Sequence, residues 1–225
     1  MVPLSDTDAS GKMNLATVTA MFQDVVSYDD FGYNIKKRTE MNFLWLLISW
    51  QINVTRFPDC EETIKVRTYL NFFKGCFSVR TFSMIDMEDN IIATGTANYA
   101  YFNKETQRIG RIPQVIIDDH FAEPHRTCET LPFGNRTNYE ATEYLGDIPV
   151  MRHDLDGNCH TNNISYIRMA LDILPFDEHP TFLEIYYEKQ SHYGDVLKAY
   201  KTQKDGRKVI VLKKDDENVA TVIFA

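Results

Sequence analysis

The sequence predicts an α+β fold made of two similar modules in tandem, each a long helix held in a curved antiparallel sheet. Two observations lead to this fold class. A polar, turn-rich segment near the N-terminus has a counterpart 148 positions later, and each copy runs into a stretch with apolar residues at helical spacing. Strand-like runs follow each predicted helix, so the order of turn, helix and strands occurs twice.

The repeat is clearest where each helix is expected to begin. SDTDASGKMNLATVTAMFQD at 5–24 aligns without a gap with HDLDGNCHTNNISYIRMALD at 153–172, and Asn14 falls on Asn162. Both asparagines are expected to cap a helix, because a short side-chain oxygen accepts from free N–H groups of the first turn. Helical spacing is carried by Leu15, Val18, Met21, Phe22, Val25 and Val26 in the first copy, and by Ile164, Ile167, Leu171 and Leu174 before Pro175 in the second.

Runs rich in aromatic and β-branched residues predict the strands. The first half contains FLWLLISWQINVTRF, ETIKVRTYLNFF, FSVRTFSMID and IIATGTANYAYFN, and the second contains FLEIYYEK, DVLKAYKTQ, KVIVLKK and NVATVIFA. Turn pairs such as Asp89-Asn90 and Asp205-Gly206 separate them. A second echo relates EETIKV at 61–66 to GDVLKA at 194–199, so the similarity extends beyond the helices.

The order of elements sets the expected domain organisation. We expect an N-terminal module at 1–112, a linker at 113–149 that is rich in Pro and Gly, and a C-terminal module at 150–225. A long helix buried by a curved antiparallel sheet is the hotdog arrangement. The predicted fold is therefore a tandem, or double, hotdog.

Composition excludes several classes of function. The chain has 225 residues and a formal net charge of -8, which argues against nucleic acid as a partner. It has no apolar run of about 18 residues and no secretory leader, so we expect a cytoplasmic protein that does not span a membrane. The four cysteines are scattered, which favours reduced thiols over disulfides or a zinc site, and we expect no metal and no cofactor.

The polar segment before the second helix carries the candidate catalytic residues. Asn158 and His160 stand where the first copy has Ser10 and Lys12, so reactive side chains occur in only one copy. An imidazole can take a proton from water near neutral pH, and a carboxylate such as Asp156 can orient it or activate the water itself. A helix N-terminus supplies N–H donors for a carbonyl oxygen that becomes negative when water attacks it.

The polar segment has three alternative interpretations. Asp, Asn and Gly are common in any turn before a helix, so a purely structural cap is one alternative. A calcium loop would need Gly and Glu where the chain has Cys159 and Ser165. A Cys159–His160 nucleophile pair is disfavoured, because sequence neighbours at a turn rarely face each other.

The segment DLDGNCHTNNISYIRMALDILP resembles the D-x-D-x-N-x-H-x-N-N-x-x-Y signature of acyl-acyl carrier protein thioesterases, of both the bacterial and the plant plastid branches. The matching positions are Asp156, Asn158, His160, Asn162, Asn163 and Tyr166. The resemblance covers nearly the whole chain, although the family's opening strand looks short here. It implies a double hotdog that releases free fatty acid from an acyl-phosphopantetheine thioester in fatty acid biosynthesis. Asp156, Asn158 and His160 would form the catalytic group, with Asn162 and Asn163 on the substrate side.

The chain departs from this family in the segment YYEKQSHYGDVL. Many members have Glu where this chain has Gln190, and plant members have Cys where it has Ser191. Because Gln cannot accept the proton, Gln190 would position water, and His160 or Asp156 would act as the base. Ser191 is expected to contact substrate, with a role as nucleophile less favoured. An apolar acyl tunnel is expected between helix and sheet, with candidate lining residues Met13, Leu15, Phe22, Trp45, Leu47, Trp50, Phe72 and Phe77.

The resemblance also implies a partner, an acidic acyl carrier protein with its acyl-phosphopantetheine arm. Docking would need a basic face, for which Lys36-Lys37-Arg38 and the pair Arg108 and Arg111 are candidates. A monomer acting as an internal pseudo-dimer and a homodimer both remain open. So do two other functions, an acyl-coenzyme A thioesterase and a non-catalytic acyl-binding hotdog, whereas a hotdog dehydratase fits the motif less well.

Overall fold

The computed structural model describes residues 1–31, 42–120 and 139–225. The helical elements are η1 (Leu4–Asp6), α1 (Leu15–Phe31), α3 (Gln114–His120), η2 (Arg152–Asp154) and α4 (Asn163–Asp172). The strands of the first half are β1 (Phe43–Val54), β2 (Lys65–Lys74), β3 (Phe77–Ile85), β4 (Ile91–Asn103) and β5 (Arg108–Ile109). Those of the second half are β6 (Glu143–Pro149), β7 (Phe182–Tyr187), β8 (Val196–Lys204), β9 (Arg207–Lys214) and β10 (Glu217–Phe224). The predicted helices and strands are confirmed.

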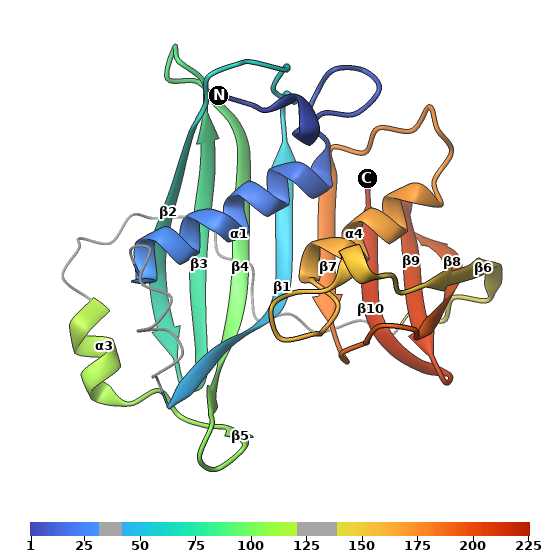
Figure 1. The fold of residues 1–225 in the computed structure, drawn as a ribbon. Helices are drawn as coiled ribbons and strands as arrows, with labels where there is room; N and C mark the ends of the chain where they lie inside the picture. Colours follow the sequence, from blue (N-terminus) through green and yellow to red (C-terminus); the bar gives the residue numbers. More distant parts are fainter. Residues whose placement is uncertain (32–41, 121–138) are drawn as a thin grey trace.

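The strands form one continuous antiparallel sheet with the order β2-β3-β4-β1-β7-β10-β9-β8-β6, and β5 pairs with β4 (Figure 1). The halves join where β1 pairs with β7, from Ser49 opposite Tyr186 to Asn53 opposite Phe182. On either side of this junction the order is the same, because β4, β3 and β2 correspond to β10, β9 and β8. The fold is the α+β double hotdog that the sequence predicts.

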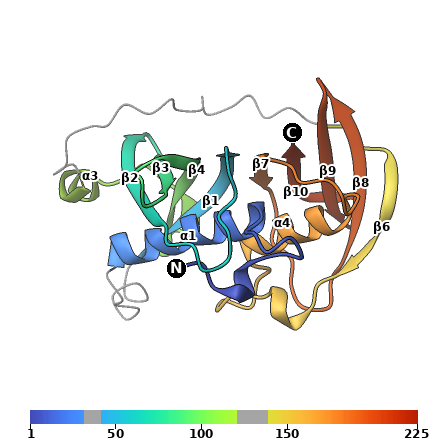
Figure 2. The same ribbon diagram turned by 90° about the horizontal axis from the view of Figure 1, so that it is seen from above.

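Both long helices lie on the same face of the sheet, and the sheet curves around them (Figures 1 and 2). The core of the first half is built on Phe22 of α1, whose ring packs against Trp50 and Phe82 with centroid distances of 6.3 and 5.3 Å. Gly95 of β4 lies directly beneath this ring, since an added Cβ would come within 2.9 Å of it. The helix can therefore approach the sheet closely because this position has no side chain.

The segment expected to be a linker contains regular structure. Residues 114–120 form α3, and residues 143–149 form β6, which pairs antiparallel with β8 at the edge of the sheet. Pro and Gly suggested a linker, but an edge strand tolerates both. Pro149 ends β6, and the register shifts between Tyr144 and Gly146. A linker throughout 113–149 is thus wrong for these two stretches, while the domain boundaries themselves stay a prediction.

None of the helices in the described ranges is long and apolar enough to cross a lipid bilayer.

Candidate active site

The polar turn before α4 is organised by one carboxylate. Asp156 Oδ1 accepts hydrogen bonds from the backbone N–H groups of Asn158 (2.8 Å) and His160 (3.1 Å). The backbone of Asp156 in turn donates to the His160 carbonyl (2.8 Å), and the Asn158 side chain lies 3.4 Å from Asp156 Oδ2. The three predicted catalytic residues are therefore brought together in one closed turn. The Asp156 carboxylate fixes the main chain of His160 and therefore the position from which the imidazole side chain projects.

The first half contains the same turn with different chemistry. Asp8 Oδ1 accepts from the backbone N–H of Ser10 (2.8 Å), and the backbone of Asp8 donates to the Lys12 carbonyl (2.8 Å), each bond 148 residues before its counterpart. Gly11 has φ of 74°, and its counterpart Cys159 has φ of 62°, so this position is left-handed in both copies. The backbone of the turn is thus the same in both copies, and the side chains differ, with Lys12 in one copy and His160 in the other.

The end of the turn is joined to the segment that follows β7. The Thr161 backbone N–H and hydroxyl both donate to the Ser191 carbonyl, at 2.8 and 3.1 Å. The Ser191 hydroxyl is 2.6 Å from the Thr161 hydroxyl and 2.9 Å from the Tyr166 hydroxyl, which also accepts from the Ser191 backbone N–H. Ser191 is fully buried. Its hydroxyl is therefore engaged inside the protein rather than presented to a substrate, which disfavours a role as nucleophile.

These bonds place two histidines face to edge. His160 and His192 form an antiparallel bridge, and their ring centroids are 5.1 Å apart at an interplanar angle of 80°. The equivalent bridge in the first half joins Lys12 to Asp59, whose side chains form a salt bridge of 2.7 Å. His192 was not predicted from the sequence. The echo between 61–66 and 194–199, extended two residues towards the N-terminus, pairs Asp59 with His192 and was the signal for it.

Charged groups stand behind His192. Asp195 Oδ2 accepts from the His192 backbone N–H (2.8 Å), lies 3.9 Å from its Nδ1, and forms a salt bridge with Lys214 (2.8 Å). Burial alone would raise the pKa of Asp195, but the hydrogen bonds and charge of Lys214 and His192 outweigh it and hold that pKa below its usual value. Asp195 is therefore a fixed negative group behind the imidazole pair.

Gln190, Asn162 and Asn163 are predicted site residues that lie after β7 and at the start of α4. Gln190 is exposed and lies two residues before His192, in the irregular segment that follows β7. The Asn162 side chain caps α4 by accepting from the Ile164 N–H (2.9 Å), and Asn14 caps α1 by accepting from the Thr17 N–H (3.1 Å). Both predicted caps are confirmed, whereas substrate contacts of Asn162 and Asn163 stay a prediction.

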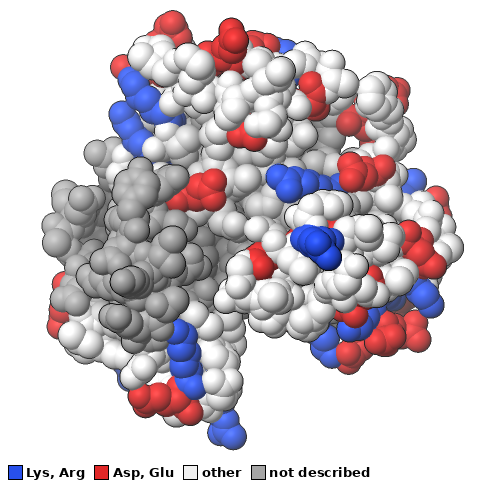
Figure 3. Space-filling model, in the orientation of Figure 1, with Lys and Arg blue, Asp and Glu red and all other residues white. Residues whose placement is uncertain are grey.

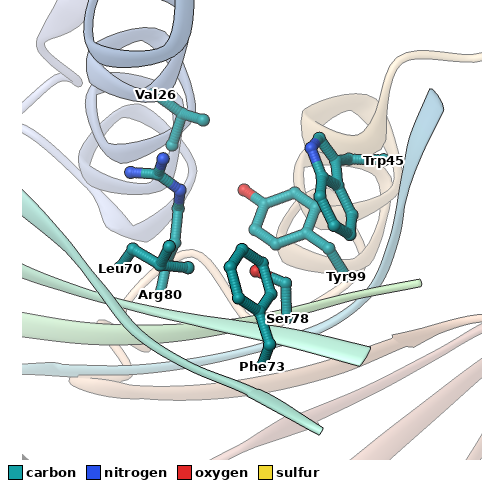
Figure 4. A pocket seen from close by; sticks show the side chains of 7 residues that line it. All are labelled: Val26, Trp45, Leu70, Phe73, Ser78, Arg80 and Tyr99. Atoms are coloured by element: carbon teal, nitrogen blue, oxygen red, sulfur yellow. The ribbon is translucent and has the colours of Figure 1, made fainter. Parts of the chain in front are cut away.

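A small pocket, partly open to solvent, lies in the first half between α1 and the sheet (Figure 4). Its walls are Val26, Trp45, Leu70, Phe73, Ser78, Arg80 and Tyr99. Trp45 is the one residue of the predicted apolar lining that borders it. Met13, Leu15, Phe22 and Trp50 are instead buried in the core, 0 to 1% exposed.

Arg80 is the unexpected member of this pocket. Its side chain is 5% exposed and lies on the helix-facing side of β3, between Ser78 and the core residue Phe82. Across the sheet it is opposite Leu70 and Ala97. The pocket is thus bordered by a guanidinium group, which Figure 4 shows pointing into the same space as the Tyr99 hydroxyl.

A row of tyrosines relates the pocket to the polar turn. Tyr99 of the pocket and Tyr166 of α4 both lie close enough to Tyr187 to affect its titration. Burial is the main reason that the pKa of Tyr187 is raised well above its usual value, and these two tyrosines add to the shift. The Tyr187 hydroxyl donates to the carbonyl of Asn163, the first residue of α4 (3.2 Å). Tyr187 thus links the first residue of α4 to the neighbourhood of Tyr99, which borders the pocket.

Within the described ranges, no group of His, Cys, Asp or Glu side chains is arranged to hold a metal ion. Cys60, Cys76 and Cys159 are free thiols, and Cys128 lies outside the described residues.

Comparison with known proteins decides the family. Residues 1–120 match the family model described as the acyl-ACP thioesterase N-terminal domain, and residues 138–223 match the acyl-ACP thioesterase C-terminal domain. The chain belongs to the acyl-ACP thioesterase family. This confirms the resemblance seen in the motif before α4.

Curated relatives in the acyl-ACP thioesterase family come from plants. The chloroplastic oleoyl-acyl carrier protein thioesterase 2 of Arabidopsis thaliana is 21% identical over 199 residues, which is 82% of this chain and 54% of the relative. The chloroplastic dodecanoyl-[acyl-carrier-protein] hydrolase of Cinnamomum camphora is 23% identical over 79% of this chain and 49% of the relative. The chain thus spans about half the length of the curated relatives it matches.

Solved acyl-ACP thioesterase structures share the whole fold. An acyl-ACP thioesterase from Bacteroides thetaiotaomicron has a TM-score of 0.87 at 21% identity and covers 99% of this chain and 93% of its own. The 12:0-ACP thioesterase from Umbellularia californica has a TM-score of 0.77 at 16% identity, with 98% and 92% covered. At these identities the structural similarity establishes the double hotdog fold alone. The proposal for the reaction is based on the residues of the candidate site.

Proposed function

We propose that this protein hydrolyses fatty acyl-acyl carrier protein to a free fatty acid and the carrier protein, as a step of fatty acid biosynthesis. The observation that carries the proposal is the closed turn of Asp156, Asn158 and His160, placed ahead of the α4 N-terminus. The first half repeats the backbone of this turn with Lys12 in place of His160, so one working site per chain is expected.

His160 and Asn158 have separate roles in the proposed hydrolysis. His160 takes a proton from water as the water oxygen attacks the thioester carbonyl carbon. The Asn158 amide and the positive end of the α4 dipole stabilise the negative carbonyl oxygen. The C–S bond then breaks, the proton passes from His160 to the departing sulfur, and the products are a carboxylic acid and the phosphopantetheine thiol.

Asp156 and Gln190 have supporting roles in this scheme. Asp156 already accepts two backbone N–H groups, so its contribution is to hold the turn that presents His160. Gln190 is exposed and can hold the water by hydrogen bonds, but an amide cannot take its proton. His160 is accordingly the base in the proposed reaction.

The acyl chain would enter the pocket between α1 and the sheet, and the carrier would dock nearby. Of the two candidate basic clusters, Lys36-Lys37-Arg38 lies outside the described residues, and Arg108 and Arg111 are exposed at β5 and just after it. Basic side chains are otherwise interspersed with acidic ones on the face in Figure 3. We propose Arg108 and Arg111 as part of the carrier contact, because a carrier protein is acidic.

The test compares two thioesters of one acyl chain, attached either to carrier protein or to coenzyme A, with wild type and four variants. His160→Ala and Asp156→Ala remove the proposed group, and Lys12→Ala and Asp8→Ala are the matched controls in the first half. The proposal expects kcat/KM to fall at least about 100-fold for His160→Ala and to change little for the controls. Wild type should prefer the carrier substrate, and Arg108→Glu/Arg111→Glu should reduce only that preference.

Each contrary result has a specific meaning. Activity that survives both His160→Ala and Asp156→Ala would refute the assigned site. Equal use of both thioesters, unaffected by the charge reversal, would make the protein a coenzyme A thioesterase. Acyl binding without turnover would make it a binding protein.

A further inference from the structure

We propose that His192 is a positioning residue of this active site, whose ring holds the imidazole of His160 in its working orientation. The proposal rests on the thioesterase function above and adds a residue that the motif before α4 does not contain. It comes from the contact between the two rings, 5.1 Å apart at 80°.

Backbone hydrogen bonds bring His160 and His192 together, whatever their side chains are. Thr161 donates twice to the Ser191 carbonyl, and Ser191 is tied to Tyr166 through both its N–H and its hydroxyl. The neighbours of this bonded pair are His160 and His192, which lie directly opposite each other in the bridge. Side chains of directly opposed residues start only about 5 Å apart on one face, so the two rings meet.

The repeat supplies independent support for a paired role. In the first half Met13 donates from its backbone to the Pro58 carbonyl, as Thr161 does to Ser191, and the next pair is Lys12 with Asp59. Those two side chains are joined at 2.7 Å. The same position of the fold therefore brings two side chains into contact in both copies. In the copy with the catalytic motif, both of them are imidazoles.

The surroundings of His192 fix its backbone. Its backbone N–H donates to Asp195, which is held by Lys214, while 56% of its side chain is exposed. The charged and titratable groups around the pair are Asp195 and Lys214 behind His192, and Asp156 beneath the main chain of His160. The Asp156 carboxylate accepts from the backbone N–H of His160, whereas the His192 ring contacts the His160 ring itself.

A positioning role of His192 explains how the site could hydrolyse a thioester although Gln190 cannot act as a base. An imidazole that acts as a base must point one nitrogen at the water, and a misplacement of about 1 Å can cost about 100-fold in rate. Edge-to-face packing restricts rotation of the His160 ring without competing for its nitrogens as a hydrogen-bond partner would. His192 thus supplies orientation, while Gln190 is available to hold the water.

The experiment uses the full chain and two substitutions that differ in one property. His192→Ala removes the ring, and His192→Phe keeps an aromatic ring that cannot carry a proton. We expect kcat to fall about 10- to 100-fold in His192→Ala with KM changed less than about threefold, and most of the loss to be recovered in His192→Phe. Asp59→Ala, at the matching position of the first half, should leave kcat unchanged.

A second measurement does not depend on turnover. The chain has 6 histidines, so the ring protons of His160 can be assigned in NMR spectra by their disappearance in His160→Ala. They should shift in His192→Ala, because the neighbouring ring current is lost. Unshifted His160 signals, or a His192→Phe variant as inactive as His192→Ala, would overturn the proposal. If wild type has no thioesterase activity at all, the proposed function fails, and the NMR result still tests the ring contact.

Discussion

Replacing Ser191 by Ala separates a structural hydroxyl from a nucleophilic one. Ser191 stands where plant family members carry a cysteine, but its hydroxyl is buried between those of Thr161 (2.6 Å) and Tyr166 (2.9 Å). Ser191→Ala removes both bonds. Each neighbour keeps a partner, because Thr161 still donates to the carbonyl of residue 191 and Tyr166 still accepts from its N–H.

The expected cost follows from these contacts. Each lost hydrogen bond contributes about 1 kcal/mol, and no polar atom is left wholly unpaired, so the free energy of unfolding should fall by about 2 kcal/mol. For a chain of this size that corresponds to a decrease in Tm of about 4–8 °C. Activity at 25 °C should stay within about tenfold of wild type, because the backbone bonds that bring His160 beside His192 are kept.

Thermal unfolding followed by circular dichroism and thioester hydrolysis of the folded variant check both expectations. Ser165→Ala is the matched control, since this buried serine makes one side-chain bond, to the Asp154 carbonyl (3.2 Å), and should lose about half as much stability. Removal of a true nucleophile would instead lower kcat by about 10⁴-fold or more. A loss of that size in Ser191→Ala, with Tm unchanged, would refute the structural role.

Three further predictions concern the pocket, the core and acid stability. Arg80→Leu should raise kcat/KM for longer acyl chains about 10-fold relative to shorter ones, because a hydrocarbon end would no longer meet a guanidinium, and a series of chain lengths measures it. Gly95→Ala should destabilise the protein by about 1–3 kcal/mol in denaturant titrations, since its Cβ would lie 2.9 Å from the buried Phe22 ring. The lowered pKa of Asp195 means that its contribution to stability is present above the ordinary carboxyl value and is lost as pH falls through the lowered one. Lys214→Met should therefore move the acid unfolding transition to higher pH.

Each of these has a control in the chain. Arg67→Leu, on an exposed position of β2, should not alter chain-length preference, and a shift equal to that of Arg80→Leu would contradict the pocket's role. Phe22→Leu should relieve part of the Gly95→Ala penalty, so purely additive losses would argue against a clash. Lys213→Met, beside Lys214 on β9, should leave the acid transition in place.

Much of the fold could be predicted because the signals are local. Helical spacing from Leu15, the cap at Asn162 and the stop before Pro175 each depend on neighbours within a few residues, and the structure has α1 beginning at Leu15 and α4 ending at Asp172. The strand β6 was missed for the same reason. Pro149 and Gly146 signal irregularity locally, and only pairing with β8 makes them an edge strand.

The candidate site also has one part that the local sequence predicts and one part that depends on tertiary contacts. The motif placed Asp156, Asn158 and His160 in one turn, and a turn is a local structure whose hydrogen bonds close within five residues. His192 is 32 positions from His160 in the chain, and its place was set by bonds between Thr161 and Ser191. The internal repeat indicated the pairing of His160 with His192, but this could be recognised only from the contact between Lys12 and Asp59 in the structure.

The sequence by itself determined the double hotdog, the two equivalent turns and the copy that carries the imidazole, because periodicity, capping and duplication are written along the chain. Tertiary structure alone decided that Ser191 is buried among hydroxyls, that Arg80 borders the pocket and that a second histidine meets the first. Those three facts depend on which strands become neighbours. Neighbours in a sheet are chosen by burial of the whole apolar surface rather than by any one segment.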